Sequence, residues 1–264
     1  MHPIERLRYV ARASGAPHAL LVRETAAALG SFGSDPSGLI TACRRVVARQ
    51  PTSGPVWWLA ARVLTAPDPL REAWAAAEEM DADRTARELS YALPDDATVA
   101  LLGWPDTVAE ALIRRGDVVA LVVDALGEGS GLVHRLILSD IDAVDVPSIG
   151  LGAAAADADL VLLEASAIGP DAFLGVAGSR AAAATARHAG VPVWLVGGAG
   201  RLLPRRMWDA LVSRVEVDDP WDADDEVVPL ELVDQVVGPQ GPEPVADALA
   251  RTDCPVAPEL FTQL

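Results

Sequence analysis

The sequence predicts an α/β protein, with a helical N-terminal domain followed by a Rossmann-like domain built on a parallel sheet. The clearest sign is a strand–helix–strand unit, in which apolar runs at Leu160–Leu163 and Val191–Val196 flank an alanine-rich helix at Ser179–His188. Short continuous apolar runs are typical of parallel strands that are covered on both faces. Gly190 and Pro192 mark the end of the helix, because glycine favours the left-handed C-cap and proline cannot continue a helix.

The first domain, residues 1–95, is predicted to be entirely helical. Apolar residues recur there at helical spacing, and glycine or proline interrupts the pattern at intervals. Trp57, Trp58 and Trp74 are expected to be buried packing residues of this bundle. The pattern predicts helices at Ile4–Gly15, Ala19–Leu29, Ser37–Arg49, Val56–Leu64 and Pro69–Leu93.

The second domain, residues 96–264, alternates short strands with helices of about ten residues, which predicts a parallel sheet. The acidic segment 216–226 is expected to be a solvated surface loop. The C-terminal stretch after it is expected to add a last strand and a short helix. Besides the two strands above, the pattern predicts strands at Val99–Leu102, Val118–Val123 and Val146–Ile149. It also predicts helices at Thr107–Arg115 and Met207–Val212, and a short helix that follows Gly127–Gly131 and runs through His134.

The net charge of −17 argues against binding to nucleic acid or anionic lipid, which requires a basic face. All 21 basic residues are arginines, so the chain offers neither a P-loop lysine nor a Schiff-base lysine. No apolar run approaches the ~20 residues of a membrane helix, and we expect a cytoplasmic protein. Cys43 and Cys254 lie far apart without metal-type spacing, so neither a metal site nor a cofactor is expected.

Two glycine-rich loops follow predicted strands and are candidate anion sites. In Gly127–Gly131 (GEGSG), backbone N–H groups and a helix N-terminus could hold a phosphate, but Glu128 places a negative charge there. In Gly197–Arg201 (GGAGR), the arginine suits an anion better. Both loops can also be glycine-rich for the geometry of the turn alone, which is the favoured interpretation for Gly127–Gly131, whereas the two interpretations are even for Gly197–Arg201.

Ser166 and Glu164 lie in a loop at the end of a strand, where catalytic groups often occur. No histidine is close in sequence to activate the Ser166 hydroxyl. His134 and His188 are expected to lie on helix surfaces, and His188 suits the negative end of its helix dipole.

Several segments, in the same order and spacing, are similar to the family of the alpha, beta and delta subunits of translation initiation factor 2B. The family also includes methylthioribose-1-phosphate isomerase and ribose-1,5-bisphosphate isomerase. The segments that carry the resemblance are SGAPHAL (Ser14–Leu20), QPTSGPVWWLA (Gln50–Ala60), VALLGWPDTVAEAL (Val99–Leu112), LLEASAI, GVAGS (Gly175–Ser179), ATARHAGVPVWLV, LVDQVVGPQG and CPVAPEL (Cys254–Leu260).

The resemblance implies a Rossmann-like C-terminal domain of the NagB/RpiA/CoA-transferase-like kind, a sugar-phosphate pocket between the two domains, and a homodimer formed through the C-terminal domain. It also implies that the isomerase groups are lost. Gly103 and Ser166 stand where the isomerases have a catalytic cysteine and aspartate, and Ser14 and Gln50 stand where they have arginines. Glycine and serine cannot move the protons of aldose–ketose isomerisation.

Two hypotheses follow. The first is a non-catalytic protein that senses a ligand or binds a partner. The second is an enzyme that acts on a phosphorylated sugar or nucleotide through other residues: Ser166, Glu164, Asp124 or Asp106 for the chemistry, and Arg12, Arg49 or Arg201 for the phosphate. The ligand-binding residues expected in either case are Gly103, Glu164, Ser166, Gly178, Ser179, Arg201, Arg12 and Arg49.

Overall fold

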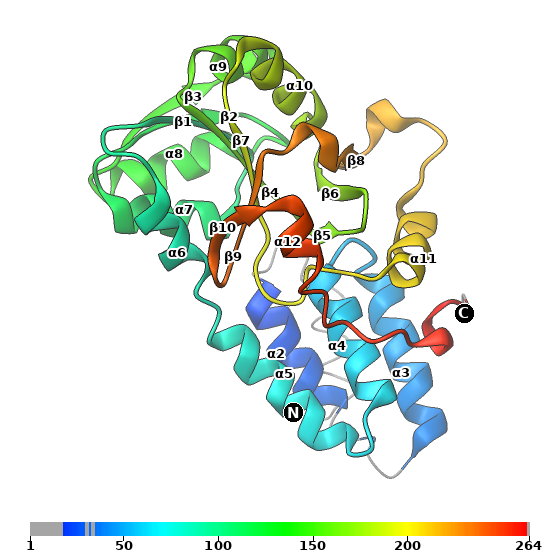
Figure 1. Ribbon diagram of the computed structural model, residues 1–264. Coiled ribbons are helices and arrows are strands. Elements are labelled where there is room, and N and C mark those ends of the chain that lie inside the picture. Colours follow the sequence, from blue (N-terminus) through cyan, green and yellow to red (C-terminus); the bar gives the residue numbers. More distant parts are fainter. Residues whose placement is uncertain (1–17, 30–31, 33–34, 263–264) are drawn as a thin grey trace.

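The computed structural model describes residues 18–29, 32 and 35–262. The predicted helix Ile4–Gly15, with Arg12 and Ser14, lies outside these residues. Figure 1 shows a group of helices at one end of the molecule and a parallel sheet with its covering helices at the other. Within the described residues, none of the helices combines the length and apolar character that crossing a membrane requires.

Two of the N-terminal helices begin at side-chain caps. Asp35 accepts a hydrogen bond from the Gly38 N–H and Asp68 from the Arg71 N–H, which satisfies donors that the first turn leaves free. The predicted single helix over Pro69–Leu93 is wrong, because Asp83 accepts hydrogen bonds from Thr85 and starts a new helix. The observed helices are α2 (His18–Leu29), α3 (Pro36–Arg49), α4 (Gly54–Thr65), α5 (Pro69–Asp81) and α6 (Thr85–Ala92).

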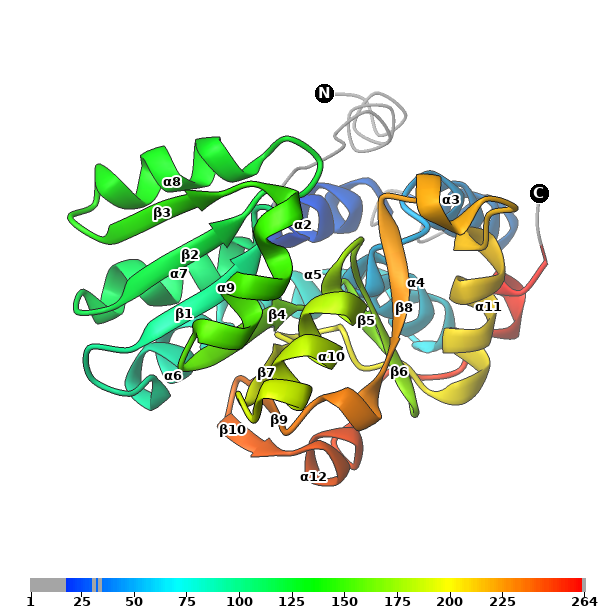
Figure 2. The ribbon, with the colours of Figure 1, turned by 90° about the horizontal axis from the view of Figure 1, so that it is seen from above.

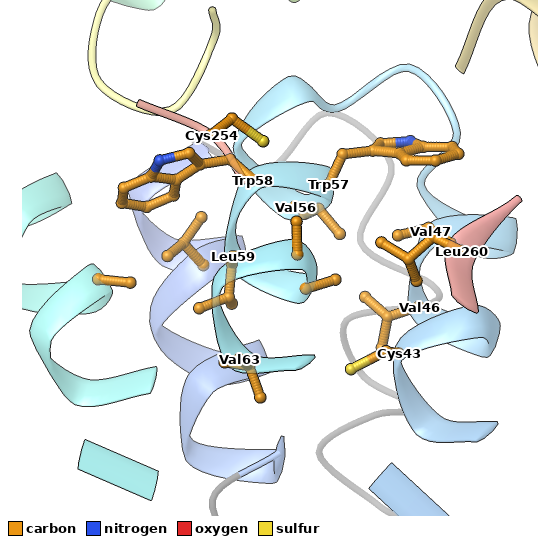
Figure 3. Packing of buried hydrophobic residues seen from close by; sticks show 14 of the residues in the cluster. Cys43, Val46, Val47, Val56, Trp57, Trp58, Leu59, Val63, Cys254 and Leu260 are labelled. Carbon is orange, nitrogen blue, oxygen red and sulfur yellow. The ribbon is translucent and has the colours of Figure 1, made fainter. Parts of the chain in front are cut away.

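The core of the helical group forms around α4. Figure 3 shows Trp57 and Trp58 extending to opposite sides of its first turn, Trp58 towards Cys254. Both indoles are fully buried, as predicted, and donate hydrogen bonds to the Pro51 carbonyl and the Asp253 carboxylate respectively. Trp74, also predicted to be buried, is instead 46% exposed on α5.

The main sheet has seven strands in the order β10-β9-β7-β4-β1-β2-β3, all parallel except β10. The four strongest strand predictions are confirmed within two residues at each end. The strands are β1 (Thr98–Leu102), β2 (Val119–Val123), β3 (Asp142–Val146), β4 (Leu160–Glu164), β7 (Val193–Val196), β9 (Gln235–Gly238) and β10 (Gly241–Pro244).

Helices cover both faces of this sheet. Buried side chains of α6, α7 and α8 share one core with it, and those of α9, α10 and α12 share the other. Figure 2 shows β3 at the free edge. The helices of this part are α7 (Asp106–Arg115), α8 (Gly129–Ile137), α9 (Leu151–Asp157), α10 (Ser179–Ala189), α11 (Arg205–Val215) and α12 (Val245–Leu249).

A second, antiparallel sheet lies in the connections and was not predicted. It consists of β5 (Ala167–Ile168), β6 (Ala172–Val176) and β8 (Asp225–Pro229). The acidic segment predicted as a surface loop therefore ends in strand β8. The predicted strand Val146–Ile149 is also wrong, since residues 148–150 form a 3₁₀ turn and the strand is β3.

The boundary at residue 95 stays a prediction, because α6, before that boundary, packs on α7, β9 and β10. The apolar C-terminal segments PVADAL and PVAPELF need a covering surface. In the structure, Ala248 packs in the core of the main sheet, whereas Ala257 and Leu260 are buried in the core of the helical group. These segments are therefore covered largely by the chain itself.

Candidate functional site

A cavity of about 710 Å³ opens at the carboxyl ends of β1 and β4. The strand order reverses between these two strands, since β2 and β3 follow β1 on one side while β7 and β9 follow β4 on the other. Open parallel sheets bind ligands at such a reversal. The loop before α4 and the start of α2 close the cavity from the helical part, so it lies between the two parts of the chain.

The polar lining comes from four regions. Helix α2 and the loop before α4 supply His18, Gln50, Thr52 and Ser53. The loops after β1 and β2, with α8, supply Trp104, Asp106, Glu128 and Arg135. The end of β4 supplies Glu164 and Ser166, and the second sheet with α10 supplies Ser179, Asp224 and Asp225.

Glu164 caps helix α7. Its Oε2 accepts hydrogen bonds from the backbone N–H groups of Thr107 and Val108 at 2.9 and 3.2 Å, and its Oε1 accepts from the Thr107 hydroxyl at 2.8 Å. Oε1 also accepts from the Arg201 guanidinium at 2.9 Å. With four donors on its two oxygens, this carboxylate holds the start of α7 and the Arg201 side chain in place, and it has little capacity left to accept a further hydrogen bond.

Arg201 is almost fully buried, with 5% of its surface exposed, and it does not line the cavity itself. Its Nη2 pairs with Glu164, but Nε and Nη1 have no hydrogen-bond partner among the described residues. A buried donor without a partner is unfavourable and unusual. The guanidinium bonds to the lining residue Glu164, and its charge acts on a second lining residue, His18.

His18 is a neutral imidazole in this environment. Burial, with a smaller contribution from the nearby Arg201 charge, lowers the pKa of His18 to about 3. Its Nδ1 lies 3.1 Å from the Ser53 hydroxyl, which fixes the ring against the start of α4.

The helix N-termini that follow the strands would be anion sites, but the chain's own carboxylates occupy them. Glu226 accepts hydrogen bonds from the N–H groups of Gly178 and Arg180 at the start of α10, at 2.8 and 2.9 Å. Asp124 accepts from the N–H of Gly129 at the start of α8, at 2.9 Å. Glu164 does the same for α7.

The two glycine-rich loops predicted as anion sites are filled in the same way. In GEGSG the Gly129 N–H is the one that Asp124 binds. In GGAGR the Ala199 N–H donates to Asp83 at 2.9 Å, and the side chain of Arg201 pairs with Glu164. Each loop therefore uses part of its N–H groups inside the fold.

The family resemblance places the isomerases' catalytic groups at Gly103 and Ser166. Gly103 does not line the cavity itself but lies between the lining residues Leu102 and Trp104. Gly103 follows β1 with a positive φ of 63°, and its N–H donates to the Val123 carbonyl at 2.9 Å. Ser166 lines the cavity, and no hydrogen bond joins its hydroxyl to a described residue. The Ser166 carbonyl accepts from the Gly54 N–H, so its backbone links β4 to helix α4.

Of the other predicted residues, Asp106 and Ser179 lie in the lining. Asp124 and Gly178 take part in helix caps instead. Arg49 is exposed on α3 and outside the lining, and Arg12 lies outside the described residues. His134 and His188 are exposed on their helices, as expected.

Sequence analysis missed several lining residues, and two of them are acidic. Asp224 and Asp225 fall in the segment expected to be a solvated surface, but they line the cavity because the end of that segment pairs with β6. Burial, together with the adjacent Asp224 charge, raises the pKa of Asp225 to about 6. The signal in the sequence for these two lining residues was a pair of adjacent aspartates immediately before an apolar strand. Five further lining residues were not singled out either: His18, Thr52, Ser53, Trp104 and Arg135.

The carboxylates of Glu128, Asp224 and Asp225 form no hydrogen bond or ion pair with a described residue. Among the described residues no group of three or more His, Cys, Asp or Glu side chains is placed to hold a metal ion. The free carboxylates of the cavity are therefore available to a ligand of another kind.

No protein-family profile and no curated protein sequence matches the chain. Three solved structures are similar over almost their whole length. The translation initiation factor eIF-2B of Pyrococcus horikoshii OT3 has a TM-score of 0.76 and 14% identity, covering 94% of this chain and 98% of that one. The eIF2B beta subunit of Chaetomium thermophilum has a TM-score of 0.72 and 17% identity, covering 99% and 93%.

The third structure is the tetrameric eIF2B-beta2-delta2 complex from C. thermophilum, with a TM-score of 0.75 and 18% identity, covering 94% of this chain and 92% of that one. Identities this low show a shared fold and do not transfer a function. The chain has the fold of the translation initiation factor eIF-2B subunits, which confirms at the level of fold the resemblance drawn from its sequence.

Proposed function

We propose that this chain is a non-catalytic ligand-binding protein with an initiation-factor-2B-like fold, which senses its ligand in the cleft between its two parts. The observation that carries the proposal is the pair of residues at the catalytic positions. Gly103 has no side chain, and Ser166 has no base within hydrogen-bonding distance among the described residues. Removing a general acid or base typically lowers a rate by ~10²–10⁴.

The neighbouring carboxylate does not replace the lost groups. Glu164 accepts three hydrogen bonds from Thr107 and Val108 and a fourth from Arg201, so both of its oxygens are engaged inside the fold. The alternative, an enzyme acting on a phosphorylated sugar or nucleotide, would have to use a carboxylate elsewhere in the lining, such as Asp225, as its base.

The test is product formation from methylthioribose 1-phosphate and ribose 1,5-bisphosphate by the purified protein. We expect no turnover. A Gly103→Cys/Ser166→Asp variant serves as the comparison, because it restores both groups, although a cysteine at the positive φ of 63° is strained. Turnover by the unmodified protein would contradict the non-catalytic proposal, and turnover by the variant alone would support it.

We also propose that the protein works in the cytoplasm as a homodimer that pairs through the edge strand β3. The edge carries large apolar side chains in contact with solvent: Ile137 and Leu138 at the end of α8, Val144 on β3 and Ile149 after it, which is 94% exposed. Exposed apolar residues gathered along one edge are typical of an interaction surface. The related beta and delta subunits of C. thermophilum form a tetrameric complex.

A further inference from the structure

A group of arginines without carboxylate partners lies on helices α3 and α11, and none of them lines the cavity described above. Nine other arginines of the described chain form ion pairs with aspartate or glutamate. The arginines of this group, which we call the arginine surface, form no ion pair with a described residue. They are Arg44, Arg45 and Arg49 on α3, and Arg206 and Arg214 on α11.

Two of these guanidiniums, Arg44 and Arg214, are half-buried beside the C-terminal 3₁₀ turn Pro258–Leu260. The Arg44 Nε donates a hydrogen bond to the Glu259 carbonyl at 2.6 Å, and the Arg214 Nη2 donates one to the Leu260 carbonyl. Figures 1 and 2 show this turn, in red, beside α3 and α11. Each guanidinium is thus bonded to a neutral oxygen, and its other donors have no acceptor among the described residues.

The two half-buried guanidiniums act on each other as like charges. Burial, with a further contribution from the Arg44 charge, lowers the pKa of Arg214, and no carboxylate offsets these effects. Glu259 meets Arg44 only through its backbone carbonyl, and its carboxylate forms no ion pair with a described residue. Neighbouring cations that are partly desolvated are unfavourable without a counter-charge, so an anion bound between them would stabilise both.

Aromatic rings hold part of the arginine surface in position. The Arg214 guanidinium carbon lies 4.7 Å from the centroid of the Trp57 ring, and that of Arg206 lies 4.9 Å from the centroid of the Phe261 ring. Because Trp57 is fully buried, Arg214 is fixed to the core of the helical group. A guanidinium that is fixed before binding loses less conformational entropy when it pairs with a carboxylate.

We propose that the arginine surface docks an acidic segment of a partner protein, whose aspartate and glutamate side chains pair with the guanidiniums of α3 and α11. A guanidinium matches a carboxylate through two parallel hydrogen bonds. Nucleic acid suits this surface less well, because the net charge of −17 repels a long polyanion, whereas a short segment meets mainly the local charge. The inference goes beyond the sensing role, since it concerns residues outside the cleft and does not depend on its ligand.

The experiment is a fluorescence anisotropy titration of a labelled peptide of alternating Asp and Glu, about eight residues long, with the full chain. We expect saturable binding that weakens as NaCl is raised from about 50 to about 300 mM, because salt screens partly exposed charges. A peptide of Asn and Gln and a single-stranded DNA of the same length should bind at least about tenfold more weakly. Inorganic phosphate at about 1 mM should not compete, because one anion replaces only one of several linked contacts.

An Arg44→Gln/Arg214→Gln variant should lose about tenfold or more in affinity for the acidic peptide. The matched control is Arg71→Gln/Arg187→Gln, which removes the same charge from exposed arginines on α5 and α10. These two arginines also form no ion pair with a described residue. The control should bind the peptide as the unmodified protein does, because only the charge of the arginine surface contacts the peptide.

Circular dichroism identifies a central variant that does not fold, and Arg45→Gln/Arg206→Gln, in which both changed residues are exposed, then takes its place. A loss of affinity confined to variants of the arginine surface would support the proposal. No binding of the acidic peptide at about 100 μM protein, an equal loss in the control, or tighter binding of the DNA would overturn it. The isomerase assay tests the non-catalytic role separately, since neither result depends on the other.

Discussion

The carboxylate of Glu164 and the guanidinium of Arg201 form a buried ion pair, with Oε1 2.9 Å from Nη2, that joins the end of β4 to the loop after β7. The same carboxylate caps helix α7 through Thr107 and Val108. One side chain at the point where the strand order reverses thus ties three segments together. Glu164 lies at the end of a strand, where catalytic groups often occur, but its hydrogen bonds hold helix α7 and Arg201 in place.

Removing the two partners of this pair should have unequal effects. Glu164→Ala leaves Arg201 buried without any described partner and should lower the free energy of unfolding by about 3–5 kcal/mol. Arg201→Met removes a cation that already has two unpartnered nitrogens, while Glu164 keeps its three donors on α7. Arg201→Met should therefore lower the free energy of unfolding clearly less than Glu164→Ala does. Urea unfolding of both variants measures the difference, and equal losses would show that the cap on α7 contributes little.

Gly103 should not tolerate a side chain, although there is room for one. The nearest atom to an added Cβ is 3.5 Å away, so the cost comes from the positive φ of 63°. We expect Gly103→Ala to destabilise the protein by about 1–2 kcal/mol. Gly152→Ala on helix α9, where an added Cβ meets nothing within 4 Å, is the control and should be neutral or stabilising. If both variants have the same midpoint in urea, backbone strain at Gly103 is refuted.

Asp225 should make stability depend on pH in a direction opposite to that of an ordinary salt-bridged aspartate. Its pKa is raised from 3.8 to about 6 in the folded protein, so the folded state binds more protons than the unfolded state between these values. The contribution of Asp225 to the free energy of unfolding therefore falls as the pH rises from 3.8 to about 6. Asp225→Asn should remove the effect and be more stable at pH 7 by up to roughly 3 kcal/mol.

The measurement is urea unfolding of both proteins at several pH values. The two curves should meet below pH 3.8 and separate as the pH approaches 6. A difference that grows towards acid pH, or no difference at neutral pH, would contradict the burial of this carboxylate.

The sequence predicted the buried parts of the fold better than the exposed ones. Strands β1, β2, β4 and β7 are continuous apolar runs because helices cover both faces of the sheet. Strand β3 (DAVDV) lies at the edge, mostly exposed, and its aspartates hide it from a search for apolar runs. The break between α5 and α6 contains neither glycine nor proline, and depends on an Asp83 contact with the distant Ala199.

The site was harder to predict for a similar reason. Ser166 and Glu164 were placed correctly at the end of a strand, because strand ends are visible in the sequence. The donors that occupy the Glu164 carboxylate come from residues more than thirty positions away, and no local pattern reveals them. The same holds for Glu226, which lies 48 positions from Gly178. A glycine-rich loop therefore could not be distinguished from an open anion site.

The edge of the sheet should hold the homodimer together. Multi-angle light scattering at micromolar concentration should give twice the 27.6 kDa of one chain. A Leu138→Arg/Ile149→Arg variant should be monomeric, because each change places a charge in the apolar contact. Leu70→Arg, at an exposed site on α5, is the control and should stay dimeric. A monomeric unmodified protein would refute the proposed assembly.

The most direct test of the self-occupied anion sites is a thermal unfolding titration with inorganic phosphate. The unmodified protein should show no shift in Tm, because Glu226 already binds the Gly178 and Arg180 N–H groups beside the cavity. Glu226→Ala frees these donors and should gain a phosphate-dependent rise of about 2–4 °C for each kcal/mol of binding linkage. Glu231→Ala, at an exposed residue nearby in sequence, is the control. A phosphate-dependent rise in the unmodified protein, or none in Glu226→Ala, would contradict the view that the chain's own carboxylates stand in for phosphate.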